Sequence, residues 1–286
     1  MLYRGGEPIF SSGSPWGEVV DQLSIDQVDL FAVNLESPFG HVEYVSRSEN
    51  PRMNLCAGED TVGILAQGGI DLVTTANNHS TDCSIYSLSI SDVVESAGIQ
   101  LLDEEKTMLL VPAGDQTVAF VAVDAYTGTF DRQSLMDAIT SAAQLSDLVV
   151  VSIHWGMEYQ AGPSREQENL AQELINAGAD VVWGHHPHVL QRMEWRESEM
   201  DGRRALVMYS LGNLLADQWM LPDTSREALV QIEFEDHGIS AIKVYPLLMN
   251  PITKRLELLE EGNEMTLITQ RLNLDSILTV VETWKD

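Results

Sequence analysis

Four segments of this chain share one design, and that design constrains the fold more than any other feature. Each segment begins with Asp, continues as a short apolar run, and ends in polar residues that can bind a metal ion. Continuous apolar runs of this length are typical of strands buried on both faces of a sheet. The runs are 29–33, 71–75, 147–153 and 180–183, followed by Asn34-Leu35-Glu36, Asn77-Asn78-His79, His154-Trp155-Gly156 and His185-His186-Pro187-His188.

Helical patterns lie around these strands, at 15–26, 84–97, 134–146 and 164–177, with Gly98 and Gly178 as helix ends. Alternation of strand and helix predicts parallel strands joined by right-handed crossovers. The carboxyl ends of parallel strands lie at one edge, where ligand sites form. We therefore expect the polar residues after the four runs to converge.

The histidines support this expectation. Five of the seven lie at these strand ends, and only His41 and His237 do not. Imidazole and carboxylate groups together suit zinc, manganese, iron and similar divalent ions. His186 and His188 are two residues apart, so in extended backbone they share a face and can chelate together. The sequence predicts a divalent-metal site built from Glu36, Asn78, His79, His154, His186 and His188.

Some of these residues also have simpler interpretations. The run 77–79 could be only a tight strand exit, because Asn and His tolerate strained turns. Asp82 could equally cap a following helix, and Glu36 could be an acid of a surface loop. Glu158 and Tyr159 could line the pocket or lie on a solvated loop.

The pattern changes in the last third of the chain. Residues 204–212 predict a strand, and the alternating runs 227–235 and 239–247 predict a hairpin around 236–238. A second hairpin is expected at 108–123, and a helix at 263–284. We expect one domain over residues 1–286, with sheet strands on both sides of the site.

Composition limits the partners. The chain has 44 acidic and 16 basic residues, a formal net charge of −28. Such a surface repels phosphate backbones and anionic lipid at long range, which argues against nucleic acid as a partner.

Cys56 and Cys83 could form a disulfide, but the sequence does not show that they meet, and we interpret both as ordinary small residues. No apolar run approaches the length of roughly 18 residues that is needed to span a membrane. Residues 1–7 lack the charged and then apolar layout of a signal peptide. The compartment stays undetermined.

Five motifs, taken together and in order over residues 16–220, resemble the CapA family of capsule synthesis proteins. That family is linked to poly-γ-glutamate capsules and is similar to the calcineurin-like metallophosphoesterases. The motifs are 34–37, 76–82, 154–159, 184–191 and 209–213.

The resemblance implies a four-layer α/β/β/α sandwich with a centre for one or two divalent ions, manganese, zinc or iron. The family's opening strand, which ends in Gly-Asp, has no counterpart before Pro15, so the first strand is expected to be missing. The core would cover 16–220, with strands and a helix at 221–286. The implied ligands are Glu36, Asn78, His154, His186 and His188; the implied catalytic pair is His79 and Asp82; the implied substrate contacts are Asn77, His185, Glu158, Tyr159 and Asn213.

The implied function is that of a metal-dependent hydrolase, of phosphoesterase type, linked to poly-γ-glutamate capsule synthesis. Two alternatives are a hydrolase or transferase of poly-γ-glutamate amide bonds, and a non-catalytic assembly accessory with a degenerate site. The expected partners are a phosphoester or poly-γ-glutamate-related substrate and capsule-synthesis membrane proteins. The resemblance also suggests an extracytoplasmic location, anchored if an upstream segment exists.

Overall fold

The structure is a computed structural model that describes residues 14–40, 55–83, 88–127, 130–218, 221–235 and 238–277, together with two short strands, β1 (Tyr3–Arg4) and β2 (Glu7–Pro8). β1 and β2 pair with each other in antiparallel fashion. Within the described residues, β3 is the first strand that joins one of the larger sheets.

The largest sheet has six strands in the order β12-β13-β11-β10-β9-β8. The inner four strands, β13, β11, β10 and β9, run parallel to one another. The edge strands β12 and β8 pair with them in antiparallel fashion. The strands are β8 (Leu109–Ala113), β9 (Gln116–Asp124), β10 (Leu148–His154), β11 (Val181–His185), β12 (Leu190–Glu197) and β13 (Arg204–Leu211).

Two three-stranded sheets and one pair of short strands complete the β structure. β3 (Ala32–Asn34), β6 (Leu72–Thr74) and β7 (Gln100–Leu102) are parallel. β14 (Arg226–Glu235), β15 (Gly238–Asn250) and β16 (Arg255–Leu258) form an antiparallel meander. The short strands β4 (Phe39–Gly40) and β5 (Ala57–Gly58) pair in parallel.

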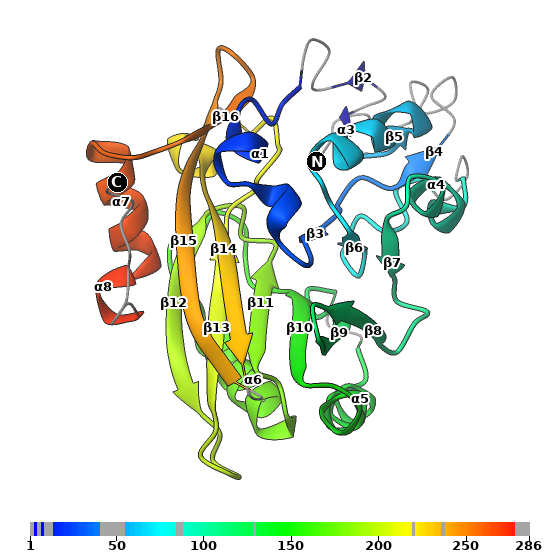
Figure 1. The fold of residues 1–286 in the computed structure, drawn as a ribbon, viewed down its shortest axis with the longest axis vertical. Coiled ribbons are helices and arrows are strands. Elements are labelled where there is room, and N and C mark those ends of the chain that lie inside the picture. Colours follow the sequence, from blue (N-terminus) through cyan, green and yellow to red (C-terminus); the bar gives the residue numbers. More distant parts are fainter. Residues whose placement is uncertain are drawn as a thin grey trace.

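The layers follow from the alternation of side chains along the strands. On β10, Val149, Val151 and Ile153 pack against α5 (Arg132–Leu145) and α6 (Arg165–Ala177). Val150 points the other way, into a core shared with the sheets of β3-β6-β7 and β14-β15-β16. The outer side of those sheets packs on α1 (Val19–Gln22), α3 (Val62–Gln67) and α4 (Ile90–Ser96) (Figure 1). The order of layers is helices, large sheet, smaller sheets, helices.

The remaining helical segments are short. η1 (Ile25–Gln27) and η2 (Glu59–Thr61) precede β3 and α3, and η3 (Pro222–Ser225) leads into β14. α7 (Asn263–Leu272) and α8 (Leu274–Ile277) lie along the β12 edge of the large sheet (Figure 1). Among the described residues, every helix is too short or too polar to cross a bilayer.

Three of the four Asp residues that open the apolar runs accept a hydrogen bond from the backbone of a neighbouring strand. Asp71 Oδ2 accepts a hydrogen bond from Phe31 N at 2.7 Å, and Asp147 Oδ2 accepts one from Thr117 N at 2.8 Å. Asp180 Oδ2 does the same for Val149 N at 2.8 Å. These carboxylates satisfy backbone N–H groups where a neighbouring strand begins, which fixes the alignment of the strand starts.

The four predicted strands and both hairpins are confirmed, except that residues 236 and 237 of the second hairpin lie outside the described residues. The four strands belong to two sheets: β3 and β6 to one, β10 and β11 to the other. The helix expected at 84–97 begins only at Ile90, where Ser89 Oγ accepts from Asp92 N, and residues 84–87 are outside the described residues.

Two other helices end earlier than expected. The helix expected at 15–26 is divided into α1 and η1, because Ser24 has left-handed backbone with φ of 49°. The C-terminal helix stops at Leu272, because Asn273 is left-handed, and resumes as α8; residues 278–286 lie outside the described residues. The interpretation of the cysteines was wrong: Cys56 and Cys83 form a disulfide, with their Cα atoms 5.2 Å apart.

Candidate metal centre

The polar residues after four strands meet where the two sheets face each other. Glu36 follows β3 and Asn78 follows β6, both from the three-stranded parallel sheet. His154 ends β10 of the large sheet, and His186 follows β11. Glu36 Oε1 lies 3.9 Å from His154 Nδ1, across the junction of the sheets. Ligands of one zinc-like ion lie about 2.0–2.2 Å from it, so two of them are about 3–4 Å apart, as observed here.

Three polar atoms on residues that follow or end these strands are buried without a hydrogen-bond partner among the described residues: Asn78 Oδ1, His154 Nδ1 and His186 Nε2. A buried polar atom left unpaired costs about 1–3 kcal/mol, so the two on the contacting rings of His154 and His186 call for a ligand, and Asn78 offers a third donor atom at the exit of β6. Amide oxygen, imidazole nitrogen and the carboxylate of Glu36 together form a donor set for a divalent transition metal. The residues present therefore fit the metal that the sequence predicts.

The two imidazoles also contact each other, with His186 Nδ1 3.1 Å from His154 Nε2. One ring must donate to the other across this contact. If Nδ1 of His154 and Nε2 of His186 both bound an ion, the two facing nitrogens would each carry a proton. Neither could then accept, so this hydrogen bond would be lost when the metal binds.

The electrostatics keep these groups in the ligand form at neutral pH. Burial lowers the pKa of His186 to about 4, with His188 adding to the effect, and it lowers the pKa of His154 well below its usual range. Burial alone would raise the pKa of Glu36, but the positive charge that His188 and His154 carry when protonated outweighs it and brings that pKa to about 2. The centre therefore combines neutral imidazoles with an ionised carboxylate.

His188 is held in place by a hydrogen-bonded chain. Its Nδ1 lies 2.7 Å from Asn213 Oδ1, which leaves Nε2 as the nitrogen that can bind a metal. Asn213 in turn donates from Nδ2 to Thr224 O at 3.0 Å and from its backbone N to Glu227 Oε2. Asn213, predicted to contact substrate, is thus placed to orient His188.

Backbone strain marks the same loop. His186 and His188 have φ of 92° and 58°, which side-chain-bearing residues rarely adopt. Such strain costs about 1–3 kcal/mol per residue and persists where the surrounding structure fixes a functional arrangement.

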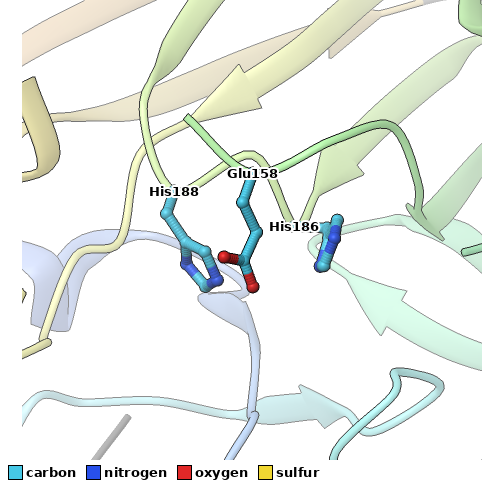
Figure 2. A group of neighbouring side chains, drawn as sticks. All are labelled: Glu158, His186 and His188. Carbon is cyan, nitrogen blue, oxygen red and sulfur yellow. The ribbon is translucent and has the colours of Figure 1, made fainter. Parts of the chain in front are cut away.

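Glu158 reaches the same loop from the turn after β10. Figure 2 shows its carboxylate between the rings of His186 and His188, and the ligand atoms of the three side chains all lie within 4.8 Å of one another. Tyr159 N donates to Pro187 O at 2.8 Å, which ties the two loops together. Both Glu158 and Tyr159 are exposed, so they line the open side of the centre, and Glu158 is also a candidate ligand.

His79 and Asp82 form a pair. His79 Nδ1 lies 2.9 Å from Asp82 Oδ2, and the same oxygen accepts from Leu55 N at 2.8 Å. Asp82 therefore orients His79; the next described helix, α4, is capped by Ser89. This contact uses Nδ1 of His79, so Nε2 lies on the side of the ring away from Asp82.

Two residues predicted to contact substrate also make hydrogen bonds within the protein. Asn77 is only 1% exposed, and it donates to Leu35 O at 2.9 Å while accepting from His79 N at 3.1 Å, so it braces the strand exits. His185 Nε2 lies 3.0 Å from Ser152 Oγ, and that hydroxyl lies 3.0 Å from Thr74 Oγ1 of β6. His185 therefore belongs to a polar link between the sheets, where burial lowers its pKa to about 3.

The sequence reasoning missed two residues that the structure brings to the centre. The ring of Tyr126 lies 3.9 Å from that of His186, centroid to centroid. Tyr126 lies just after Asp124, which ends β9 and aligns with His154, so the apolar run 117–123 followed by Asp could have revealed it. The second is Glu227, which lies inside an alternating run that gives no local sign of its role.

The sequence model of a family described as "Bacterial capsule synthesis protein PGA_cap" matches residues 4–218, which include every predicted site residue. The chain belongs to this family. The resemblance inferred from the motifs is thereby confirmed.

Among curated proteins, the "PGA biosynthesis protein CapA" of Bacillus subtilis (strain 168) is 27% identical over 248 residues, covering 79% of this chain and 63% of that protein. The "Capsule biosynthesis protein CapA" of Bacillus anthracis is 31% identical over 235 residues, covering 72% of this chain and 55% of that protein. The chain thus spans 55% to 63% of the length of these relatives.

Among solved structures, a putative 5'-nucleotidase from Staphylococcus aureus, in complex with alpha-ketoglutarate, matches with a TM-score of 0.54 and 15% identity. The match covers 94% of this chain and 56% of that one. It supports the expected metallophosphoesterase-like fold.

Proposed function

We propose that this member of the capsule synthesis family is a divalent-metal-dependent hydrolase of phosphoesterase type that acts in poly-γ-glutamate capsule synthesis. The observation that carries the proposal is the pair of contacting rings of His154 and His186, each with a buried nitrogen that has no hydrogen-bond partner among the described residues, next to the carboxylate of Glu36. The names of the Bacillus relatives supply the link to capsule and PGA biosynthesis.

The roles of the residues follow from their placement. Glu36, Asn78, His154, His186 and His188 would hold one or two ions, with Glu158 as a further candidate. A bound divalent ion there would supply an activated water and would neutralise charge on a phosphoryl group. His79 is the proton donor: Asp82 accepts from Nδ1, which keeps a proton available at Nε2 once the ring is protonated.

The first experiment tests metal dependence. The metal-stripped protein is supplied with Mn²⁺, Zn²⁺ or Fe²⁺ and assayed on bis(p-nitrophenyl) phosphate and p-nitrophenyl phosphate. We expect activity with at least one ion and a loss of about a hundredfold or more in His186→Ala, since loss of a ligand weakens both the metal and its chemistry. His185→Gln is the matched control, because the neighbouring ring faces Ser152. Unchanged activity in His186→Ala would refute the proposal.

The second experiment tests the proton donor. A p-nitrophenolate leaves without protonation, whereas an alkyl alkoxide needs a proton. We therefore expect His79→Gln to slow hydrolysis of methyl phosphate esters by about a hundredfold while changing p-nitrophenyl esters much less. An equal effect on both substrates would remove His79 from this role.

One alternative keeps the same centre with another substrate. A metal centre polarises an amide carbonyl as well as a phosphoryl group, and the Bacillus subtilis relative is named for PGA biosynthesis. Release of glutamate or shorter chains from poly-γ-glutamate, with no phosphoesterase activity under any ion, would favour the amide reaction.

A further inference from the structure

The turn after β10 carries a carboxylate over the exposed side of the metal centre. The carboxylate of Glu158 lies between the rings of His186 and His188 (Figure 2), and the ligand atoms of the three side chains lie within 4.8 Å of one another. The two histidines are buried, whereas Glu158 is exposed. A molecule that reaches the histidines from this side therefore meets the carboxylate first.

Backbone contacts fix this turn beside the histidine loop. Tyr159 N donates to Pro187 O at 2.8 Å. The O atom of the next residue, Gln160, accepts from Nε2 of Gln191 at 2.8 Å, and Gln191 is 0% exposed. Glu158, which directly precedes Tyr159, is therefore held beside the loop by its neighbours in the chain.

The carboxylate itself does not hold the fold together. Within the part of the chain that the structure describes, no hydrogen bond or ion pair ends on the Glu158 carboxylate. By contrast, Arg192 binds the structural acids Glu168 and Glu194, at 2.6 and 3.1 Å. The charge of Glu158 nevertheless acts on the centre: burial lowers the pKa of His186, and Glu158 is one of the negative groups that oppose this effect.

The local charges would act on a phosphoryl group in the same way. The groups with the strongest electrostatic effect on His186 are His188, Glu36, Glu158 and His79, with no described lysine or arginine among them. A phosphomonoester carries about two negative charges at neutral pH, whereas a phosphodiester carries one. Coulomb energy is proportional to charge, so Glu158 repels the monoester about twice as strongly as the diester.

We infer that Glu158 is a specificity-determining residue, whose carboxylate at the exposed side of the metal centre discriminates against doubly charged phosphoryl groups and favours phosphodiesters. The choice of phosphoesters rests on the proposed function. The discrimination by charge does not, because it applies to any anion that binds the centre. Its exposure separates Glu158 from Glu36, the buried carboxylate that lies 3.9 Å from His154.

Anion binding to the metal-loaded protein tests this role without hydrolysis. The probes are methylphosphonate and dimethylphosphinate, which have no ester bond and carry two charges and one charge when fully ionised. Calorimetric titration at a pH where both are fully ionised gives the two affinities. We expect Glu158→Gln to bind dimethylphosphinate about threefold more tightly than the wild type does, as for unit charges about 6 Å apart in water. The gain for methylphosphonate should be about tenfold, because the effect of two charges is the square of the effect of one.

Salt and two further variants show whether charge is the cause. The difference between the two gains should shrink at about 1 M salt, where charges are screened beyond about 3 Å. Glu158→Asp keeps the charge and should keep the wild-type preference. Asp115→Asn is the matched control, because it removes the same charge from the exposed turn between β8 and β9, at the opposite end of the large sheet, and should change neither affinity.

Several outcomes of the titration would overturn the inference. These are failure of the loaded wild type to bind either probe, equal gains for both probes in Glu158→Gln, and a difference that salt does not reduce. The ion is supplied in excess, and bound metal is measured in every variant. Loss of metal from Glu158→Gln at a concentration that saturates the wild type would make Glu158 a ligand, which would overturn the inference as well.

Hydrolysis then tests the preference for diesters. The ratio of kcat/KM for bis(p-nitrophenyl) phosphate to that for p-nitrophenyl phosphate should fall by about threefold in Glu158→Gln, since the monoester gains more from the loss of the charge. An unchanged ratio would overturn the preference. Absence of hydrolysis with every ion would refute the proposed function, whereas the titration would still decide the role of Glu158.

Discussion

Glu227 is the buried carboxylate behind the metal centre. It is 1% exposed, and its Oε2 accepts from the backbone N of Asn213 and from Leu214 N at 2.8 Å. Its Oε1 is buried without a hydrogen-bond partner among the described residues. Gly212, with φ of 85°, lets the chain pass close to it, since a Cβ there would lie 2.3 Å from Glu227 Oε2. Glu227 thus fixes the turn from which Asn213 orients His188.

The pH dependence of stability tests this role. Burial raises the pKa of Glu227 from 4.5 to about 8, although the two backbone N–H groups oppose it. The folded state therefore holds a proton that the unfolded chain releases, and stability falls as pH rises through the folded pKa. Between pH 7 and 9 the loss from this one group is about 1 kcal/mol. We expect Glu227→Gln, which keeps an acceptor for both N–H groups, to lack this loss in chemical denaturation.

Metal affinity tests the same role of Glu227 at the metal centre. Glu227→Gln should bind metal like the wild type at pH 7, whereas Glu227→Ala should bind it about tenfold or more weakly, because Asn213 and His188 lose their support. If the wild type and Glu227→Gln lost stability in parallel above pH 7, Glu227 would not carry the buried proton.

At this scale the sequence was informative about candidate ligands and silent about their supports. Imidazoles are rare and cluster after apolar runs, so His154, His186 and His188 could be singled out directly. Glu227 is one acid among 44 acidic residues, and its role depends on a turn that comes from another part of the chain. His185 shows the converse: its neighbour His186 faces the centre, but the alternation of side chains turns His185 toward Ser152.

The segment that carries His79 is fixed by a covalent link. Cys56 directly follows Leu55, whose N–H donates to Asp82, and Cys83 directly follows Asp82. The disulfide therefore joins the donor and acceptor sides of the hydrogen bond that holds Asp82 against His79. It closes a loop of 27 residues that includes β5, α3 and β6.

Removing this link should affect both stability and proton donation. For a loop of this length, the loss of the cross-link should cost about 3 kcal/mol of unfolding free energy, mainly through the unfolded state. We expect a Cys56→Ser, Cys83→Ser double variant to unfold at lower denaturant concentration and to lose activity on alkyl phosphate esters more than on p-nitrophenyl esters. Dithiothreitol should reproduce the effect in the wild type and leave the double variant unchanged. Equal sensitivity of both proteins to the reductant would contradict it.

Elements with a strong local pattern were predicted correctly. The apolar runs of β10 and β11 are buried on both faces, and Gly178 ends α6 as expected. The sequence could not show that β3 and β6 belong to a different sheet from β10 and β11, because strand pairing depends on distant segments. β12 was missed because Arg192, Glu194 and Arg196, which pair with one another and with Glu168, interrupt its apolar pattern.

At the scale of the whole molecule, the metal centre lies on the junction of two sheets. Glu36 and Asn78 follow strands of the three-stranded sheet, whereas His154 ends a strand of the large sheet and His186 and His188 follow another. In the described residues, the link Thr74–Ser152–His185 already crosses the same junction through neutral hydrogen bonds. A bound ion would add a second and stronger link, because its ligands come from both sides.

Thermal unfolding with and without metal tests this arrangement. A ligand that binds only the folded state at a hundred times its Kd adds about 2.7 kcal/mol of stability. For a chain of this size each kcal/mol corresponds to about 2–4 °C, so metal removal should lower Tm by roughly 5–10 °C.

His186→Ala should start from a low Tm and respond little to metal or chelator, whereas His185→Gln should lose some stability yet keep the full response. Asn78→Ala, on the opposite sheet, should reduce the response as His186→Ala does, since the ion stabilises the junction only if both sheets supply ligands. A response that survives in Asn78→Ala but disappears in His186→Ala would restrict the ion to the large sheet and would disprove the bridge.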